Sequence, residues 1–203
     1  MFEAKNLKQI AFFDFDGTIT TKDTLLEFIK FTKGTMAFYV GFLLYSPFLV
    51  AYKLKLISNQ TAKEKVLAHF FKGMPVPAFE EKCLAFAKQV IPGLLRPKAL
   101  EEIKQLKEQG VQVVIVSASP ENWIRPWASQ VQAALLGTRL QTDNGLLTGK
   151  IFEQNCHGNE KVKRIKACYQ LSDYSQIYTY GDTSGDKPML ALGTKQHYKP
   201  FRN

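Results

Sequence analysis

Cysteine is scarce in this chain of 203 residues: Cys83, Cys156 and Cys168 lie far apart, with no Cys-x-x-Cys spacing. An odd number of widely spaced cysteines argues against a disulfide-stapled fold and predicts reduced thiols in a cytosol-like compartment. We also expect no signal peptide, because aspartates interrupt the first apolar run within a few residues. The sequence therefore predicts a cytoplasmic protein.

The sequence also has no lysine- or arginine-rich run with interleaved aromatic residues, no internal repeat and no low-complexity linker. The net charge of +9 would suit nucleic acid, an anionic membrane surface or a phosphorylated small molecule. Without such a basic run we do not expect nucleic acid as a partner. With 45% hydrophobic and 22% charged residues, the chain can bury a core, and its length fits one core domain with a sizeable insertion.

Alternating strand and helix patterns predict an α/β fold. We expect strands at 9–14, 111–117, 176–182 and 195–201, helices at 93–109, 121–130 and 160–171, and a hairpin at 133–152 around Asp143-Asn144-Gly145. Residues 21–90 have helical apolar spacing. This order predicts a three-layer, Rossmann-like, mostly parallel sheet with a helical cap inserted after the first strand. The expected core domain is 1–20 and 91–203, and the expected cap domain is 21–90.

The first strand ends in the sequence FFDFDGT, which holds Asp14 and Asp16 two positions apart. Strand periodicity can aim both carboxylates at the carboxyl edge of the sheet, where ligands of α/β proteins gather. Gly17 would let backbone approach a ligand closely, and Thr18 adds a hydroxyl and an amide. The alternative for an Asp-Gly pair is a simple turn.

Two further polar groups follow later elements. Ser117, with Ala118 after it, ends the strand at 111–117, and Lys161 opens the helix at 160–171. A hydroxyl and an ammonium at this edge could hold phosphate oxygens. The alternatives are a helix cap or turn for the serine and a solvated surface lysine.

A second acidic pair closes the pattern: the strand at 176–182 ends in Asp182, and Asp186 follows four residues later. Magnesium prefers hard oxygen ligands and retains water, so Asp14, Asp182 and Asp186 could form a Mg²⁺ site. The alternative is an Asp-rich turn that caps a helix.

In combination, DxDGT, a strand ending in serine, a lysine and GDxxxD resemble the haloacid dehalogenase superfamily, and the helical insert resembles its subfamily IB, which contains phosphoserine phosphatase. CHGNEKV and YGDTSGDKPML are similar to the phosphatidylglycerophosphatase C-like branch. The resemblance implies a Mg²⁺-dependent phosphatase that hydrolyses a phosphomonoester through a phosphoaspartate, with Asp14 as the nucleophile and Asp16 as the general acid/base. It further implies phosphate binding by Gly17, Thr18, Ser117, Ala118 and Lys161. Asp14, the Asp16 carbonyl and Asp182 would hold Mg²⁺, with Asp186 in support.

The sequence of the cap does not identify the substrate. Residues 20–90 contain ten lysines, five acidic residues and no arginine. Phosphoserine phosphatases use a cap glutamate and a cap arginine, whereas Asp23 stands at the glutamate position here, and lysine lacks the bidentate fork of arginine. Three functions therefore stay open. The first is a phosphatase of a lipid phosphate, which residues 36–52 favour. The other two are a soluble small-molecule phosphatase of the phosphoserine phosphatase type and a non-catalytic phosphate-binding module.

Residues 36–52 form an uncharged apolar stretch that contains Pro47 and is followed by Lys53 and Lys55. It would fit a helix buried between cap and core, an interfacial helix, or a marginal membrane span. The interfacial alternative predicts peripheral membrane contact through residues 36–56 at the inner face of the cytoplasmic membrane. It favours a lipid phosphate such as phosphatidylglycerophosphate as the substrate.

Overall fold

A computed structural model describes residues 8–54 and 56–202. Residues 1–7, Lys55 and Asn203 lie outside this range, and so do the parts of the predicted core domain and of segment 36–56 that fall on them. The strands are β1 Lys8–Phe13, β2 Gln112–Pro120, β3 Ala134–Thr138, β4 Leu140–Asp143, β5 Leu146–Ile151, β6 Tyr174–Gly181 and β7 Lys195–Tyr198. The helices are α1 Thr24–Lys33, α2 Thr35–Lys53, α3 Asn59–Phe71, α4 Val76–Gln89, α5 Ile91–Leu94, α6 Pro97–Glu108, α7 Glu121–Gln130, α8 Asn159–Cys168 and α9 Lys187–Leu190.

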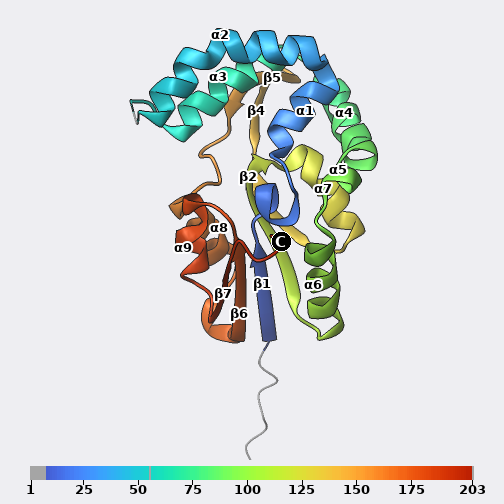
Figure 1. Cartoon of the computed structure of the whole chain (residues 1–203), viewed down its shortest axis with the longest axis vertical. Coiled ribbons are helices and arrows are strands. Elements are labelled where there is room, and N and C mark those ends of the chain that lie inside the picture. Colours follow the sequence, from blue (N-terminus) through green and yellow to red (C-terminus); the bar gives the residue numbers. More distant parts are fainter. Residues whose placement is uncertain (1–7, 55, 203) are drawn as a thin grey trace, which may run out of the picture.

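The central sheet has five parallel strands in the order β3-β2-β1-β6-β7. β1 lies in the middle because it is apolar on both faces: Ala11 and Phe13 pack with residues of α6 and α7, and Ile10 and Phe12 pack with residues of α8 and α9. Figure 1 shows these helix pairs on opposite sides of the sheet. The predicted α/β fold class is confirmed.

The cap follows β1 as α1 to α4 and lies beyond the carboxyl ends of the strands (Figure 1). The helix predicted at 93–109 is in fact two helices, α5 and α6. They are separated where Leu95 pairs with Thr20, and the N–H of Arg96 donates to the carbonyl of Ile19 at 2.8 Å. Pro97 then begins α6, a position where its missing N–H costs nothing.

The segment predicted as a hairpin contributes to two sheets. β3 joins the main sheet beside β2, and β4 and β5 form the hairpin, with Asn144 and Gly145 at φ of 47° and 76° as a type I′ turn requires. The hairpin packs on α3, where a Cβ at Gly149 would lie 2.3 Å from the Cα of Ala68. The proposed core domain of 1–20 and 91–203 therefore contacts the proposed cap domain of 21–90 through this hairpin.

The apolar stretch 36–52 belongs to α2, which lies on the outside of the cap (Figure 1). The interpretation as a helix buried between cap and core is therefore wrong, since one face of α2 is exposed. Pro47 cannot donate to the carbonyl of Leu43, but the Ser46 hydroxyl does so at 2.7 Å, which helps the helix continue. Among the described residues, no helix has both the length and the apolar character needed to cross a membrane.

Candidate active site

The candidate site lies where neighbouring parallel strands end. β1 delivers Asp14, β2 delivers Ser117, and β6 delivers Asp182 to the same edge of the sheet. Lys161 enters from the first turn of α8, and Asp186 from the short turn Ser184–Asp186. The structure thus brings together groups that the sequence separates by up to 172 positions, from Asp14 to Asp186.

Lys161 is held between two carboxylates. Its Nζ donates to Oδ1 of Asp14 at 2.5 Å and to Oδ1 of Asp186 at 2.7 Å, and the lysine side chain is only 1% exposed. It is therefore not a solvated surface lysine. Burial disfavours the charge on Lys161, but the two carboxylates outweigh burial and raise its pKa above the usual range, so the ammonium stays protonated.

The two carboxyl groups respond differently to this shared cation. Burial raises the pKa of Asp14 to about 7, because Lys161 offsets only part of the desolvation and the charges of Asp186 and Asp16 add to it. Burial also acts on Asp186, but there the Lys161 charge and hydrogen bond, with bonds from Thr183, prevail and lower its pKa. Of these two carboxyl groups, Asp14 is therefore the one whose pKa lies near neutral pH.

Asp16 is held separately from Asp14 by the start of the cap. Its Oδ1 accepts from the N–H of Thr24 at 2.7 Å and from the Thr24 hydroxyl at 2.6 Å, and its Oδ2 accepts from the Ser117 hydroxyl at 3.2 Å. The indole Nε1 of Trp123 in turn donates to the Thr24 hydroxyl at 3.0 Å. These contacts hold the Asp16 carboxylate beside the cavity, and Asp16 takes no part in the ion pairs that Lys161 forms with Asp14 and Asp186.

The carboxylates of Asp14, Asp182 and Asp186 offer one oxygen each within 4.8 Å of one another. Such a set of hard oxygen ligands fits Mg²⁺. Gly17 is required beside it, since its φ is +81° and a Cβ there would lie 2.5 Å from Oδ2 of Asp182. The same oxygen accepts from Arg202 at 2.5 Å, so the structure already places a cation against this carboxylate.

Asp186 also has a structural role. Its Oδ2 accepts from the N–H of Asp182 at 3.2 Å and from the N–H and hydroxyl of Thr183 at 2.9 and 2.7 Å. Asp186 therefore caps this turn, as the alternative interpretation predicted, and also pairs with Lys161. Thr18 links the other two carboxylates, because its hydroxyl lies 3.2 Å from Oδ2 of Asp14 and 3.4 Å from Oδ1 of Asp182.

A cavity of about 300 Å³ opens over these groups. It is lined by Asp14, Asp16, Asp23, Asn59, Lys63, Ala118, Ser119, His157, Lys161, Thr183, Ser184, Gly185 and Asp186. Three of these residues, Asp23, Asn59 and Lys63, come from the cap, so cap and core enclose the cavity together. Lys63 spans the gap: its Nζ donates to the carbonyl of Ala118 at 3.0 Å and to Oδ1 of Asn155 at 3.3 Å.

Sequence reasoning missed several of these contacts. Thr24, Lys63, Asn155 and Arg202 carry no motif, and only the count of ten cap lysines pointed towards a residue such as Lys63. His157, four positions before Lys161, could from sequence either reach this pocket or lie exposed in a loop; it lines the cavity, where burial and then the Lys161 charge lower its pKa.

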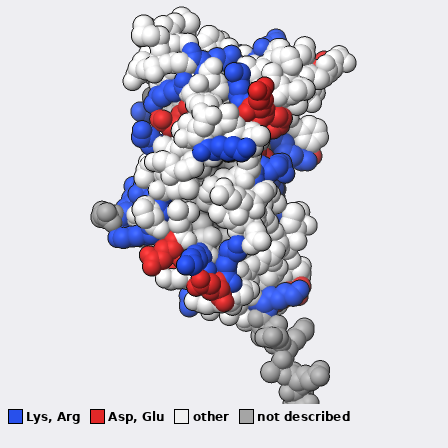
Figure 2. Space-filling model, turned by 90° about the vertical axis from the view of Figure 1, so that its right-hand side faces the viewer, with Lys and Arg blue, Asp and Glu red and all other residues white. Residues whose placement is uncertain are grey.

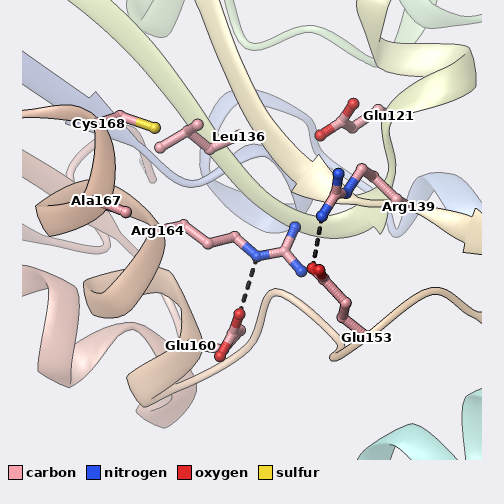
Figure 3. A pocket seen from close by; sticks show the side chains of 8 residues that line it. All are labelled: Glu121, Leu136, Arg139, Glu153, Glu160, Arg164, Ala167 and Cys168. Atoms are coloured by element: carbon pink, nitrogen blue, oxygen red, sulfur yellow. Dashed lines mark hydrogen bonds and ion pairs between the residues drawn. The ribbon is translucent and has the colours of Figure 1, made fainter.

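A larger hollow of about 470 Å³ lies elsewhere, between α8, β3 and the loop before α8 (Figure 3). Its arginines are already paired, Arg164 with Glu160 at 3.1 Å and Arg139 with Glu153 at 2.5 Å. Each arginine is paired with a glutamate, and the described residues that line the hollow include no aspartate. The hollow therefore lacks the carboxylate nucleophile and metal ligands that a phosphoryl-transfer site of this kind needs. The smaller cavity over Asp14 is therefore the candidate active site.

Comparison with known proteins agrees with this geometry. The sequence profile of the haloacid dehalogenase-like hydrolases matches residues 11–191. The chain belongs to this family. Within the family it is 38% identical to the protein CicA of Caulobacter vibrioides over 94% of this chain and 85% of CicA. It is 27% identical to a probable phosphatase of Mycobacterium tuberculosis over 98% of this chain and 71% of that protein.

The haloacid dehalogenase-like fold is also seen in a solved structure of phosphoserine phosphatase with bound substrate. That structure superposes with a TM-score of 0.67 over 92% of this chain and 83% of its own, at 18% identity. The chain is thus a hydrolase of this family with a phosphoserine phosphatase-like architecture. None of these matches singles out the phosphatidylglycerophosphatase C-like branch.

Proposed function

We propose that this protein is a Mg²⁺-dependent phosphatase that hydrolyses small soluble phosphomonoesters through a phosphoaspartate on Asp14. The observation that carries the proposal is the separation of the two aspartates. Asp14 is bound by Lys161 at 2.5 Å, whereas Asp16 is bound by Thr24 at the start of the cap and by Ser117 in β2. Two carboxylates in such different surroundings suit the two roles of nucleophile and acid/base.

In the first step an oxygen of Asp14 attacks phosphorus, and the bond to the leaving alcohol breaks. Asp16 gives its proton to the leaving oxygen, so the products are a neutral alcohol and an acyl phosphate. In the second step water attacks the acyl phosphate, Asp16 takes the proton of that water, and inorganic phosphate leaves. Ser117, Lys161 and the backbone near Gly17 and Ala118 would hold the phosphoryl oxygens.

Mg²⁺, held by Asp14, Asp182 and the Asp16 carbonyl with Asp186 in support, would supply positive charge that offsets the phosphate oxygens. The three converging carboxylates support this assignment. Lys161 would remain the protein's own cation at the site, because its two ion pairs keep it protonated.

For the substrate, we favour a small phosphomonoester whose alcohol bears an anionic group. Lys63 reaches the cavity from α3, and Asp23 lines it at the start of α1. Lys63 would bind the anionic group as a point charge, in place of the arginine that the cap lacks. A cavity of only about 300 Å³ between cap and core favours a small leaving group over a lipid phosphate. The similarity to a solved phosphoserine phosphatase also supports the soluble alternative.

Phosphate release would test the proposal, with phosphoserine, glycerol phosphate, p-nitrophenyl phosphate and phosphatidylglycerophosphate in micelles as substrates. We expect Mg²⁺-dependent release from soluble esters and none from Asp14→Asn. The matched control is Asp173→Asn, which makes the same change at an exposed position. Lys63→Met should raise KM for anionic alcohols more than KM for p-nitrophenyl phosphate, whereas Lys65→Met on the same helix should alter neither.

Three results would contradict the proposal. Faster phosphate release from phosphatidylglycerophosphate than from the soluble esters would favour the lipid phosphatase hypothesis. Residual Mg²⁺-dependent activity in Asp14→Asn would exclude Asp14 as the nucleophile. Mg²⁺ binding without any phosphate release would favour the non-catalytic phosphate-binding module.

A further inference from the structure

The outermost helix of the cap presents an apolar face to the outside. Met36, Leu43 and Leu44 are 78%, 75% and 61% exposed, and Tyr39, Val40 and Val50 are more than half exposed. We call these six residues the outer stripe of α2. Positions 36, 40, 43 and 44 follow the spacing of one side of a helix. Isolated exposed apolar side chains are ordinary, but a contiguous stripe marks a surface that contacts something.

The inner face of α2 explains why the stripe stays outside. Phe38, Gly41 and Phe42 face the rest of the cap, and the Phe42 and Phe70 rings stack at 6.5 Å. A Cβ at Gly41 would lie 2.3 Å from Cζ of Phe70, so this glycine lets α2 pack tightly on α3. The packing orients α2, so the outer stripe cannot turn inward without breaking this contact.

The charges around the stripe favour an anionic partner. Residues 35–58 contain no acidic residue. Exposed lysines stand at both ends of α2, Lys33 just before it and Lys53 as its last residue, and the ammonium of Lys65 lies 5.6 Å from the centre of the Phe48 ring on α2. Figure 2 shows a largely uncharged surface at the end of the molecule that carries α2, with lysine or arginine atoms beside it and a cluster of acidic atoms further along the same face.

We propose that α2 docks on an anionic lipid surface, with the outer stripe in the headgroup region and the flanking lysines on lipid phosphates. Apolar side chains with a rim of lysines are the combination that interfacial helices use, and each lysine near an anionic surface adds attraction. Tyr39 suits the boundary, because its ring is apolar and its hydroxyl is polar. A second copy of this chain would instead bring two lysine rims together, which disfavours self-association through the stripe.

The position of α2 determines where the cavity over Asp14 would lie relative to the membrane. In Figure 1, α2 lies at the far end of the cap from the core. The cavity over Asp14 is instead lined by residues of both cap and core. A membrane under the outer stripe would leave the cavity open to water. The enzyme would therefore act on soluble substrates while bound to the surface, and docking is independent of the proposed substrate.

Vesicle flotation would test the proposal, with phosphatidylcholine alone and with phosphatidylcholine mixed with phosphatidylglycerol. We expect binding to the anionic vesicles only, and weaker binding as salt is added. The variant Leu43→Glu/Leu44→Glu should lose binding by about a hundredfold, because it removes apolar contact and adds negative charge. Leu84→Glu, at an exposed leucine of α4, is the matched control and should bind like the parent protein.

Phosphate release from a soluble ester, measured on every variant, shows that the chain is folded and tests the proposed function separately. Absence of binding to anionic vesicles would overturn docking, and so would equal binding by Leu43→Glu/Leu44→Glu. A dimer in sedimentation velocity that this variant dissolves, without vesicle binding, would assign the stripe to a second copy.

Discussion

The Lys161 ion pairs allow a prediction whose size follows from burial. In Lys161→Met, the Asp14 and Asp186 carboxylates would lose the ammonium that lies 2.5 and 2.7 Å away, while all three residues are buried. Removing one partner of a buried charge pair costs about 3–5 kcal/mol, because the remaining charge stays desolvated. For a domain of this size, that corresponds to a fall in Tm of roughly 6–20 °C.

The predicted loss of unfolding free energy in Lys161→Met increases with pH. Without Lys161, both carboxyl groups would have a folded-state pKa above the unfolded value of about 4. Such groups bind protons more readily in the folded state, so lowering the pH stabilises the fold. The free-energy difference from the parent protein should therefore be largest above pH 7, near the pKa of Asp14, and shrink towards pH 5.

Urea unfolding of metal-free protein at several pH values, followed by the fluorescence of the buried Trp123 and Trp127, would measure this difference. Lys163→Met is the matched control, since that lysine side chain is 70% exposed and should cost less than about 1 kcal/mol. Equal costs for Lys161→Met and Lys163→Met, or a cost independent of pH, would refute the argument.

Three further outcomes can be measured directly. Because a proton and Mg²⁺ compete for Asp14, whose pKa is about 7, calorimetry should show Mg²⁺ affinity falling up to tenfold per pH unit below 7, and a constant affinity would contradict this. Gly17→Ala should lower the urea midpoint and weaken Mg²⁺ binding, since its Cβ would lie 2.5 Å from an Asp182 oxygen; unchanged binding would argue against this contact. Gly149→Ala should lower the free energy of unfolding more than Gly145→Ala. Both glycines have a positive φ, but of the two only Gly149 would place a Cβ within 4 Å of other backbone. Equal losses of unfolding free energy would indicate backbone strain without a steric clash at Gly149.

The sequence was informative where local pattern decides structure. Apolar runs ending in Asp14, Ser117 and Asp182 predicted parallel strands, and parallel strands bring their carboxyl ends to one edge whatever the intervening chain does. The turn at Asn144-Gly145 and the cap after the first strand followed from equally local signals.

Contacts made over long distances in the chain left no such signal. Lys63 meets Ala118 across 55 positions, and Arg202 meets Asp182 across 20. Neither lysine nor arginine at those positions differs in pattern from the many other basic residues of the chain. The orientation of α2 was also not predictable, because it is apolar on both faces and packing against α1 and α3 decides which face is buried.

The same long-range contacts join substrate recognition to the position of the cap. The buried Asn155 binds the first turn of α3 through Asn59 at 2.5 Å and Gln60 at 3.1 Å, and it also accepts from Lys63. An ammonium has three donors, and among the described residues Lys63 gives two of them to Ala118 and Asn155. The proposed substrate anion would take the third. Lys63 can make all three contacts only while α3 rests on the core, so an anionic leaving group would favour the closed cap that excludes water from the phosphoaspartate.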